Sequence, residues 1–270
     1  MKSKKKINNP ENFAIEFHKT YRSYAKFTGF NFITRYLHGT RHRNLEKLIV
    51  HASKEKKGKL KIVDVGCGPA IAYEVIKKLG IDFEYCGIEL GEDFYNKAYE
   101  SFNQFENFEI IHDSIENQFE KFTDADIIIC LESCEHIPEW LVVRTIEAIS
   151  KSPFMYLYVT VPNEVGPAIF IKNIGSALMG YKRYKEYEWR ETFYASIYNL
   201  DKVRRHDLGH IGFDWRWLAH TLRQNTTIIK KTSSPFNFIP KFISPSIGFI
   251  CVNTDSVSYT HLTLPTIYSV

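Results

Sequence analysis

KIVDVGCGPA, residues 61–70, joins a strand pattern to a glycine turn that opens a helix. The β-branched residues around Asp64 are typical of a strand buried inside a sheet. Gly66 and Gly68 allow a tight backbone turn and leave no Cβ in the way of an approaching ligand. This order of strand, turn and helix predicts a nucleotide-binding unit whose ligand lies at the carboxyl end of the strand.

Asp64 restricts the ligand that this turn is expected to bind. A pyrophosphate prefers amide donors without a nearby carboxylate, whereas an ammonium or sulfonium group is attracted by one. S-adenosylmethionine carries both of these cations. The segment 64–70 resembles motif I of the class I S-adenosylmethionine-dependent methyltransferases, with Ala70 where that family often has a third glycine. A nicotinamide oxidoreductase is disfavoured, because Ile71 stands where Gly-x-Gly-x-x-Gly needs its last glycine.

Acidic residues after the next two strands extend the resemblance. Glu89 follows the strand 83–88, at the place where a doubly wound fold puts a carboxylate against ribose hydroxyls. After the strand 107–111, Asp113 matches an acid that the family often uses to accept from the adenine amino group; the alternative is an N-cap for a helix from Ile115. The resemblance implies cofactor binding by Asp64, Gly66, Cys67, Gly68, Glu89, Leu90, Asp113, Ser114 and Leu131.

The segment after the fourth apolar strand contains the candidate catalytic residues. Residues 132–138 resemble the segment with Glu-His-Ile that many small-molecule methyltransferases of this class carry at this place. Glu135 and His136 are candidate bases for a hydroxyl acceptor, as is His210 in a Gly-His segment before a predicted helix. His136 has a second interpretation, in which it orients the loop. A carbon or nitrogen acceptor needs no dedicated base.

Strands alternate with helical segments from Leu60 to Val161, which predicts right-handed crossovers and a parallel sheet. Two more strands are expected at 226–231 and 246–252. The predicted fold class is therefore α/β: a Rossmann-like, doubly wound, mostly parallel seven-stranded sheet with an antiparallel last strand. N-terminal helices and a helical, aromatic insertion after strand five complete it.

We expect an N-terminal helical cap at 1–58 and an S-adenosylmethionine-binding domain at 59–256, interrupted by a substrate-cap insertion at 165–208. Residues 257–270 resemble a translated sequencing adapter and are excluded from the expected fold. On this interpretation the natural sequence is cut near Asp255.

The insertion combines aromatic and cationic side chains, which suit a cap that stacks on a ring or sugar and holds an acidic group. Its apolar start, residues 166–171, also suits contact with a membrane surface. The alternative is a lid that only packs on the core. The residues concerned are Phe170, Lys172, Tyr181, Lys182, Arg183, Tyr184, Lys185, Tyr187, Trp189, Arg190, Phe193, Tyr194 and Tyr198.

Composition narrows the class of protein. With 270 residues and 44% hydrophobic residues, the chain can bury a core without disulfides. Five cysteines, several in core positions, indicate reduced thiols and a cytoplasmic location.

No metal is expected, because Cys130, Cys134 and His136 have no second ligand pair. No apolar stretch reaches transmembrane length. A net charge of +4 disfavours a nucleic-acid partner.

The expected activity is transfer of a methyl group from S-adenosylmethionine to a small-molecule, glycan or lipid-linked acceptor. Two alternatives stay open: a non-catalytic binding or scaffold protein with the same fold, and an RNA or protein methyltransferase. The identity of the acceptor, the choice among O-, N- and C-methylation and the oligomeric state do not follow from the sequence.

Overall fold

The computed structural model describes residues 32–178, 188–204 and 210–254, with side chains for 39–174, 188–204 and 210–254. Its longer elements are α2 (Phe32–Glu55), β1 (Leu60–Val65), α3 (Ile71–Lys77), β2 (Phe83–Glu89), α4 (Glu92–Phe102), β3 (Phe108–His112), β4 (Ile127–Leu131), α5 (Glu139–Ser150), β5 (Tyr156–Pro162), α6 (Pro167–Leu178), α7 (Trp189–Ser196), α8 (Trp215–Asn225), β6 (Thr227–Ser234) and β7 (Ser246–Val252). Short 3-10 helices are η2 (Ile115–Asn117), η3 (Phe119–Phe122), η4 (Cys134–His136) and η6 (Leu200–Lys202). Among the described residues, no helix is both long enough and apolar enough to cross a membrane.

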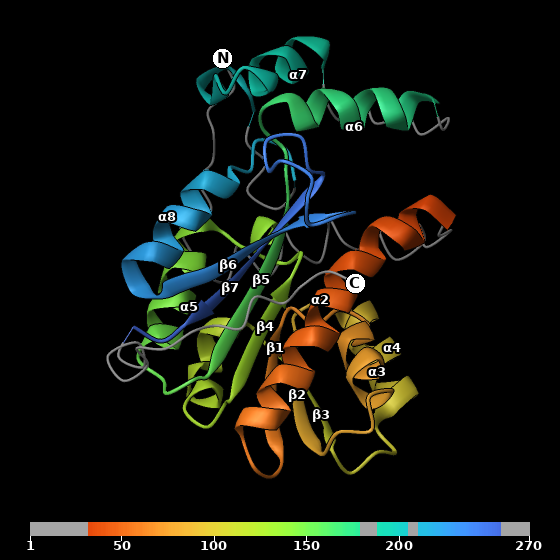
Figure 1. The fold of residues 1–270 in the computed structure, drawn as a ribbon, viewed down its shortest axis with the longest axis vertical. Helices are drawn as coiled ribbons and strands as arrows, with labels where there is room; N and C mark the ends of the chain where they lie inside the picture. The colour runs from red at the N-terminus through yellow and green to blue at the C-terminus, as the bar shows by residue number, and fades with distance from the viewer. Residues whose placement is uncertain (1–31, 179–187, 205–209, 255–270) are drawn as a thin grey trace.

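The strands form one seven-stranded sheet in the order β3-β2-β1-β4-β5-β7-β6 (Figure 1). Neighbours from β3 to β5 are parallel, and β7 pairs antiparallel with both β5 and β6. The predicted α/β class, the seven strands and the antiparallel last strand are confirmed. Since β1 lies between β2 and β4, the strand order changes direction there. This change leaves a crevice at the carboxyl ends of β1 and β4, where open α/β sheets bind ligands.

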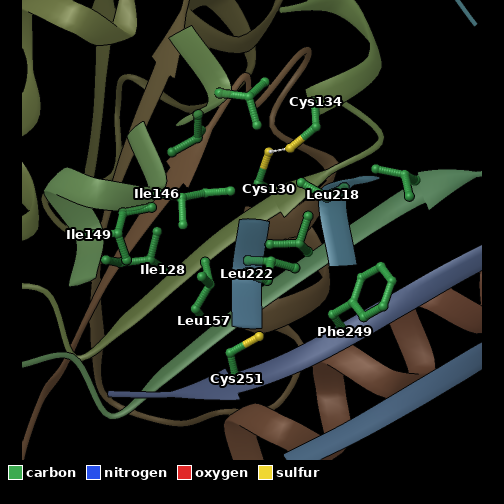
Figure 2. Close-up of a cluster of buried hydrophobic side chains, with 14 of the residues drawn as sticks. Ile128, Cys130, Cys134, Ile146, Ile149, Leu157, Leu218, Leu222, Phe249 and Cys251 are labelled. Carbon is green, nitrogen blue, oxygen red and sulfur yellow. Dashed lines mark hydrogen bonds between the residues drawn. The ribbon is translucent and has the colours of Figure 1, made fainter. Parts of the chain in front are cut away.

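Helices cover both faces of the sheet, which explains why its strands are apolar on both sides. On one face, α5 and α8 bury a core that includes Ile146, Leu157 and Leu222 (Figure 2). On the other face, α2 and α3 bury a second core that includes Ile49 and Tyr73. The two cores hold β1 and β4 in place, so the loops after these strands project from a rigid edge.

Helix α2 is the described part of the predicted N-terminal helical cap. It packs on the sheet, and the hydroxyl of Tyr156 in β5 donates a 2.7 Å hydrogen bond to Glu55 at its end. The rest of that cap, residues 1–31, and the adapter-like tail, residues 257–270, lie outside the described residues. The domain boundaries at residues 58 and 256 therefore stay predictions.

The chain after β5 forms the helical insertion that the sequence predicts. Helices α6 and α7 lie together beyond the end of the sheet (Figure 1). They share a small core of Ile169, Ala195, Val203 and Ile211. Residues 179–187 and 205–209 of the insertion lie outside the described residues. Ile211 is the neighbour of His210, so this small core joins the insertion to a candidate catalytic residue.

A buried ion pair anchors the insertion to the sheet. Glu164, whose side chain is 1% exposed, pairs with Lys172 of α6. We expect Lys172→Met to destabilise the fold by about 3–5 kcal/mol, because it leaves a buried carboxylate without its cation. Urea unfolding measures the loss, and the double variant Glu164→Gln, Lys172→Met should recover part of it. Equal losses in the single and double variants would show that the pair contributes nothing through its charges.

Candidate active site

The glycine turn after β1 has the backbone conformation that its sequence requires. Gly66 and Gly68 have φ of +65° and +56°, and the amides of Gly66 and Cys67 donate to the carbonyl of Ile88 at 2.9 and 3.2 Å. A Cβ built on Gly66 would lie 2.8 Å from Ser133, whereas a Cβ on Gly68 would meet nothing within 4 Å. Gly66 is therefore required by packing, and Gly68 faces open space that a ligand can fill.

Asp64 is the buried carboxylate beside this turn. It is 2% exposed, and its Oδ2 accepts a 2.6 Å hydrogen bond from the hydroxyl of Tyr85. Its Oδ1 is buried and accepts no hydrogen bond within the described residues. Burial raises the pKa of Asp64 to about 7, and the charge of Glu89 adds to this effect. An unsatisfied carboxylate oxygen at this place fits a cationic ligand group.

Glu89 at the end of β2 is a second buried acid. Its two oxygens accept 2.7 Å hydrogen bonds from the amides of Gly68 and Gly91. Burial raises the pKa of Glu89 to about 7 although these amides oppose the shift. The bond to Gly68 ties Glu89 to the glycine turn, so the predicted ribose-binding acid and the predicted cofactor turn lie in contact.

These two acids predict a pH dependence of the cofactor-free protein. Their pKa values of about 7 in the folded state exceed the values near 4 of unfolded chains. The folded state therefore binds more protons, and this contribution to the free energy of unfolding falls as pH rises from about 4 to 7. In urea unfolding across this range, the free energy of unfolding of the double variant Asp64→Asn, Glu89→Gln should fall less steeply with pH than that of wild type. An unchanged slope would contradict the burial of both charges.

The predicted adenine-binding acid lies in a turn after β3. Burial alone would raise the pKa of Asp113, but hydrogen bonds from Asn117, Gln118 and the Ser114 amide lower it below its usual value. The helix expected from Ile115 is the single 3-10 turn η2, and Ser114 rather than Asp113 occupies its N-cap position. The role of Asp113 toward a ligand stays a prediction.

The segment after β4 contacts the glycine turn directly. Ser133 donates a 2.9 Å hydrogen bond from its Oγ to the carbonyl of Gly66. The next side chain, Cys134, points into the core, where its sulfur lies 3.3 Å from that of Cys130 (Figure 2). Leu131 is half-buried at the end of the strand, near the same edge. The thiols that suggested a metal set therefore lie in the core.

The three candidate catalytic residues, Glu135, His136 and His210, lie close together in the structure. The two histidines are 74 positions apart in the sequence. The Nδ1 of His210 lies 3.5 Å and the Nε2 of His136 3.8 Å from the same oxygen of Glu135. The two imidazole rings have centroids 4.7 Å apart. Burial raises the pKa of Glu135 to about 8, although the nearby His136 opposes the shift. The three candidate catalytic residues thus form one cluster.

Two residues of this site were not predicted from the sequence. Tyr85 holds Asp64, and Ser133 holds the turn. Tyr85 precedes Gly87 by two positions on β2, and Gly87 pairs in register with Asp64. A period-two pattern along this strand is the signal that places Tyr85 on the same face of the sheet as Gly87.

Comparison with known proteins supports the family that the motifs indicate. A family model described as a methyltransferase domain matches residues 36–223, well over half of the chain. A search of curated protein sequences finds no significant match. Similar solved structures include magnesium protoporphyrin IX methyltransferase (ChlM) from Synechocystis PCC 6803, with TM-score 0.55, 12% identity and coverage of 90% of this chain and 100% of that one.

Two further structures have similar folds. The CurJ carbon methyltransferase matches with TM-score 0.53 and 12% identity over 78% of this chain and 54% of that chain. The small RNA methyltransferase HEN1 matches with TM-score 0.55 and 16% identity over 82% of this chain and 26% of that chain. At these identities the likeness concerns the fold alone. Together with the family match, it establishes that the chain belongs to the class I S-adenosylmethionine-dependent methyltransferases.

Proposed function

We propose that the protein binds S-adenosylmethionine at the carboxyl ends of β1 and β2 and transfers its methyl group to a small-molecule or lipid-linked acceptor. One observation carries the cofactor site: Gly68 faces open space beside Asp64, whose buried Oδ1 accepts no hydrogen bond within the described residues. A ligand with a cationic end satisfies both features. S-adenosylmethionine is such a ligand and is the methyl donor of this family.

The remaining site residues have proposed roles along the cofactor. Asp64 attracts the ammonium and sulfonium charges, and the turn around Cys67 provides backbone contacts. Glu89 already accepts from the amides of Gly68 and Gly91, and a carboxylate has further acceptor capacity, which we assign to the ribose hydroxyls. Leu90 and Leu131 supply apolar walls, and Asp113 with Ser114 lies on the adenine side.

When bound, S-adenosylmethionine supplies an electrophilic methyl group on its sulfonium. The chain must then hold the acceptor in line with that group and, for a hydroxyl acceptor, take up its proton. We assign the acceptor end of the site to Glu135, His136 and His210. Glu135 follows two residues after Ser133, which touches the glycine turn, and His210 joins it from the segment before α8. The chain therefore connects the cluster to the glycine turn of the proposed cofactor site through Ser133.

The insertion favours an apolar or lipid-linked acceptor over an RNA. Its helices expose six large apolar side chains: Phe170, Ile171, Ile174, Trp189, Phe193 and Ile197. Four cations of the insertion are described. Lys172 pairs with Glu164 and Arg204 pairs with Glu191, Lys202 lies 4.8 Å from the centre of the Tyr194 ring, and Arg190 is exposed. Binding to RNA depends on cations that are available to phosphates. This face presents apolar surface to an acceptor instead.

The test of the acceptor class is methyl transfer from S-adenosylmethionine labelled in its methyl group. The purified protein is incubated with a lipid extract, a glycan extract and total RNA, and label is counted in each fraction. We expect label in the lipid or apolar small-molecule fraction, and a reduced amount with Trp189→Ser, Phe193→Ser. Label in the glycan fraction alone would contradict the apolar acceptor, label in RNA would support the alternative RNA methyltransferase, and binding of cofactor without label in any fraction would support a scaffold.

A further inference from the structure

The Glu135, His136 and His210 cluster has the chemistry and spacing of a metal site. Each of its side chains offers one ligand atom, and these atoms all lie within 4.8 Å of one another. Around an ion with bonds of about 2.1 Å, neighbouring ligand atoms are about 3.0–3.5 Å apart. The separations of 3.5 and 3.8 Å from the Glu135 oxygen are within a few tenths of an ångström of this range, and the rest of the set, which extends to 4.8 Å, needs a side-chain rotation of about 1 Å to close around an ion.

The carboxylate of Glu135 is the observation that points to a bound cation. The residue is 0% exposed, and neither of its oxygens accepts a hydrogen bond within the described residues. A buried carboxylate without hydrogen bonds is costly unless a cation or a metal accompanies it. The charge of Arg41 acts on Glu135 from a distance, but its guanidinium forms its 3.8 Å ion pair with Glu132, whose other oxygen accepts from Ser246 at 2.6 Å.

We propose that Glu135, His136 and His210 bind one divalent transition-metal ion, such as Zn²⁺ or Co²⁺. Two imidazoles and a carboxylate suit these ions better than Mg²⁺ or Ca²⁺, which prefer oxygen ligands. This reverses the expectation of no metal, which considered the thiols of Cys130 and Cys134; those thiols face the core.

Solvent reaches the cluster, since the side chains of His136 and His210 are 16% and 29% exposed. Three protein ligands leave at least one position of a four-coordinate ion for water or another ligand, as in catalytic sites. Such an ion would hold an oxygen of the acceptor and lower its pKa, which makes it a better nucleophile. This second step rests on the proposed function, whereas the binding of the ion does not.

The test is titration of Co²⁺ into the full-length, untagged protein after treatment with a chelator. We expect one Co²⁺ per chain and a visible absorption band of Co²⁺ bound by nitrogen and oxygen ligands. His210→Ala and Glu135→Gln should each weaken binding by at least about tenfold. His220→Ala is the matched control, because His220 is an exposed histidine on α8, and it should bind Co²⁺ as wild type does. Calorimetry with Zn²⁺ repeats the comparison.

Several outcomes would overturn the metal site. These are the absence of stoichiometric binding, binding that survives both His210→Ala and Glu135→Gln, or a thiolate charge-transfer band, which would place the ion on the cysteines. Affinity for S-adenosylmethionine is measured on the same metal-free samples. A protein that binds S-adenosylmethionine but no ion refutes the metal site alone, and one that binds the ion but no S-adenosylmethionine refutes the proposed function alone. Thermal melting of each variant excludes unfolding as the cause.

Discussion

Asp64→Asn is expected to weaken the binding of S-adenosylmethionine by about 100-fold, since hydrogen bonds to charged groups are worth about 1.5–3 kcal/mol. The same change should leave the cofactor-free fold at least as stable as wild type. The two effects have one cause. The carboxylate is buried, its pKa is raised to about 7, and one of its oxygens accepts no hydrogen bond within the described residues. Its charge therefore costs stability until a cation is bound.

Calorimetric titration measures the affinity, and urea unfolding at about pH 8 measures the stability, because the carboxylate is ionised there. Asp124→Asn is the matched control, since the side chain of Asp124 is 81% exposed and the change alters the net charge equally. A variant at Asp64 that loses stability and keeps its affinity would show that the carboxylate has a structural role.

The second large effect is expected from alanine substitutions at the two glycines of the turn. One substitution should mainly lower stability, and the other should mainly prevent cofactor binding. Gly66→Ala places a Cβ 2.8 Å from Ser133 in a left-handed backbone conformation. We expect it to destabilise the fold by about 2–5 kcal/mol, or to lower Tm by about 5–15 °C. Gly68→Ala meets no atom within 4 Å, so its cost is the backbone strain of about 1–2 kcal/mol.

Gly68→Ala should nevertheless abolish cofactor binding, because its new Cβ occupies the space that we assign to the ligand. Differential scanning calorimetry and binding titration on both variants separate the two effects. If Gly68→Ala binds S-adenosylmethionine as wild type does, the open space beside Gly68 is not the cofactor site. If Gly66→Ala melts as wild type does, the contact with Ser133 does not hold the turn.

The sheet was predictable because each of its signals is local. A β-branched run such as residues 61–65 and a positive-φ glycine after it depend on neighbours in sequence, and alternating strands and helices with right-handed crossovers give a parallel sheet. The turn after β3 was less predictable. Asp113 and Ser114 both suit an N-cap, and which one occupies the position depends on the side-chain contacts of Asn117 and Gln118.

The contact between Glu135 and His210 could not be predicted from the sequence. Each residue was a candidate base because of its own sequence motif. Their separation of 3.5 Å results from the packing of the segment before α8 on the insertion through Ile211. The role of Ser133 is likewise a long-range contact, because it lies 67 positions after Gly66 in the sequence. Contacts of this kind depend on tertiary packing, which a linear pattern does not contain.

The most direct test of the central claim is calorimetric titration of S-adenosylmethionine, and separately of NADH, into the wild-type protein, Asp64→Asn and Gly68→Ala. We predict micromolar binding of S-adenosylmethionine to wild type, about −8 kcal/mol, none of NADH, binding of S-adenosylmethionine about 100-fold weaker in Asp64→Asn, and none in Gly68→Ala. A folded wild-type protein that binds no S-adenosylmethionine, or variants that bind it unchanged, would contradict the assignment of the cofactor to this turn.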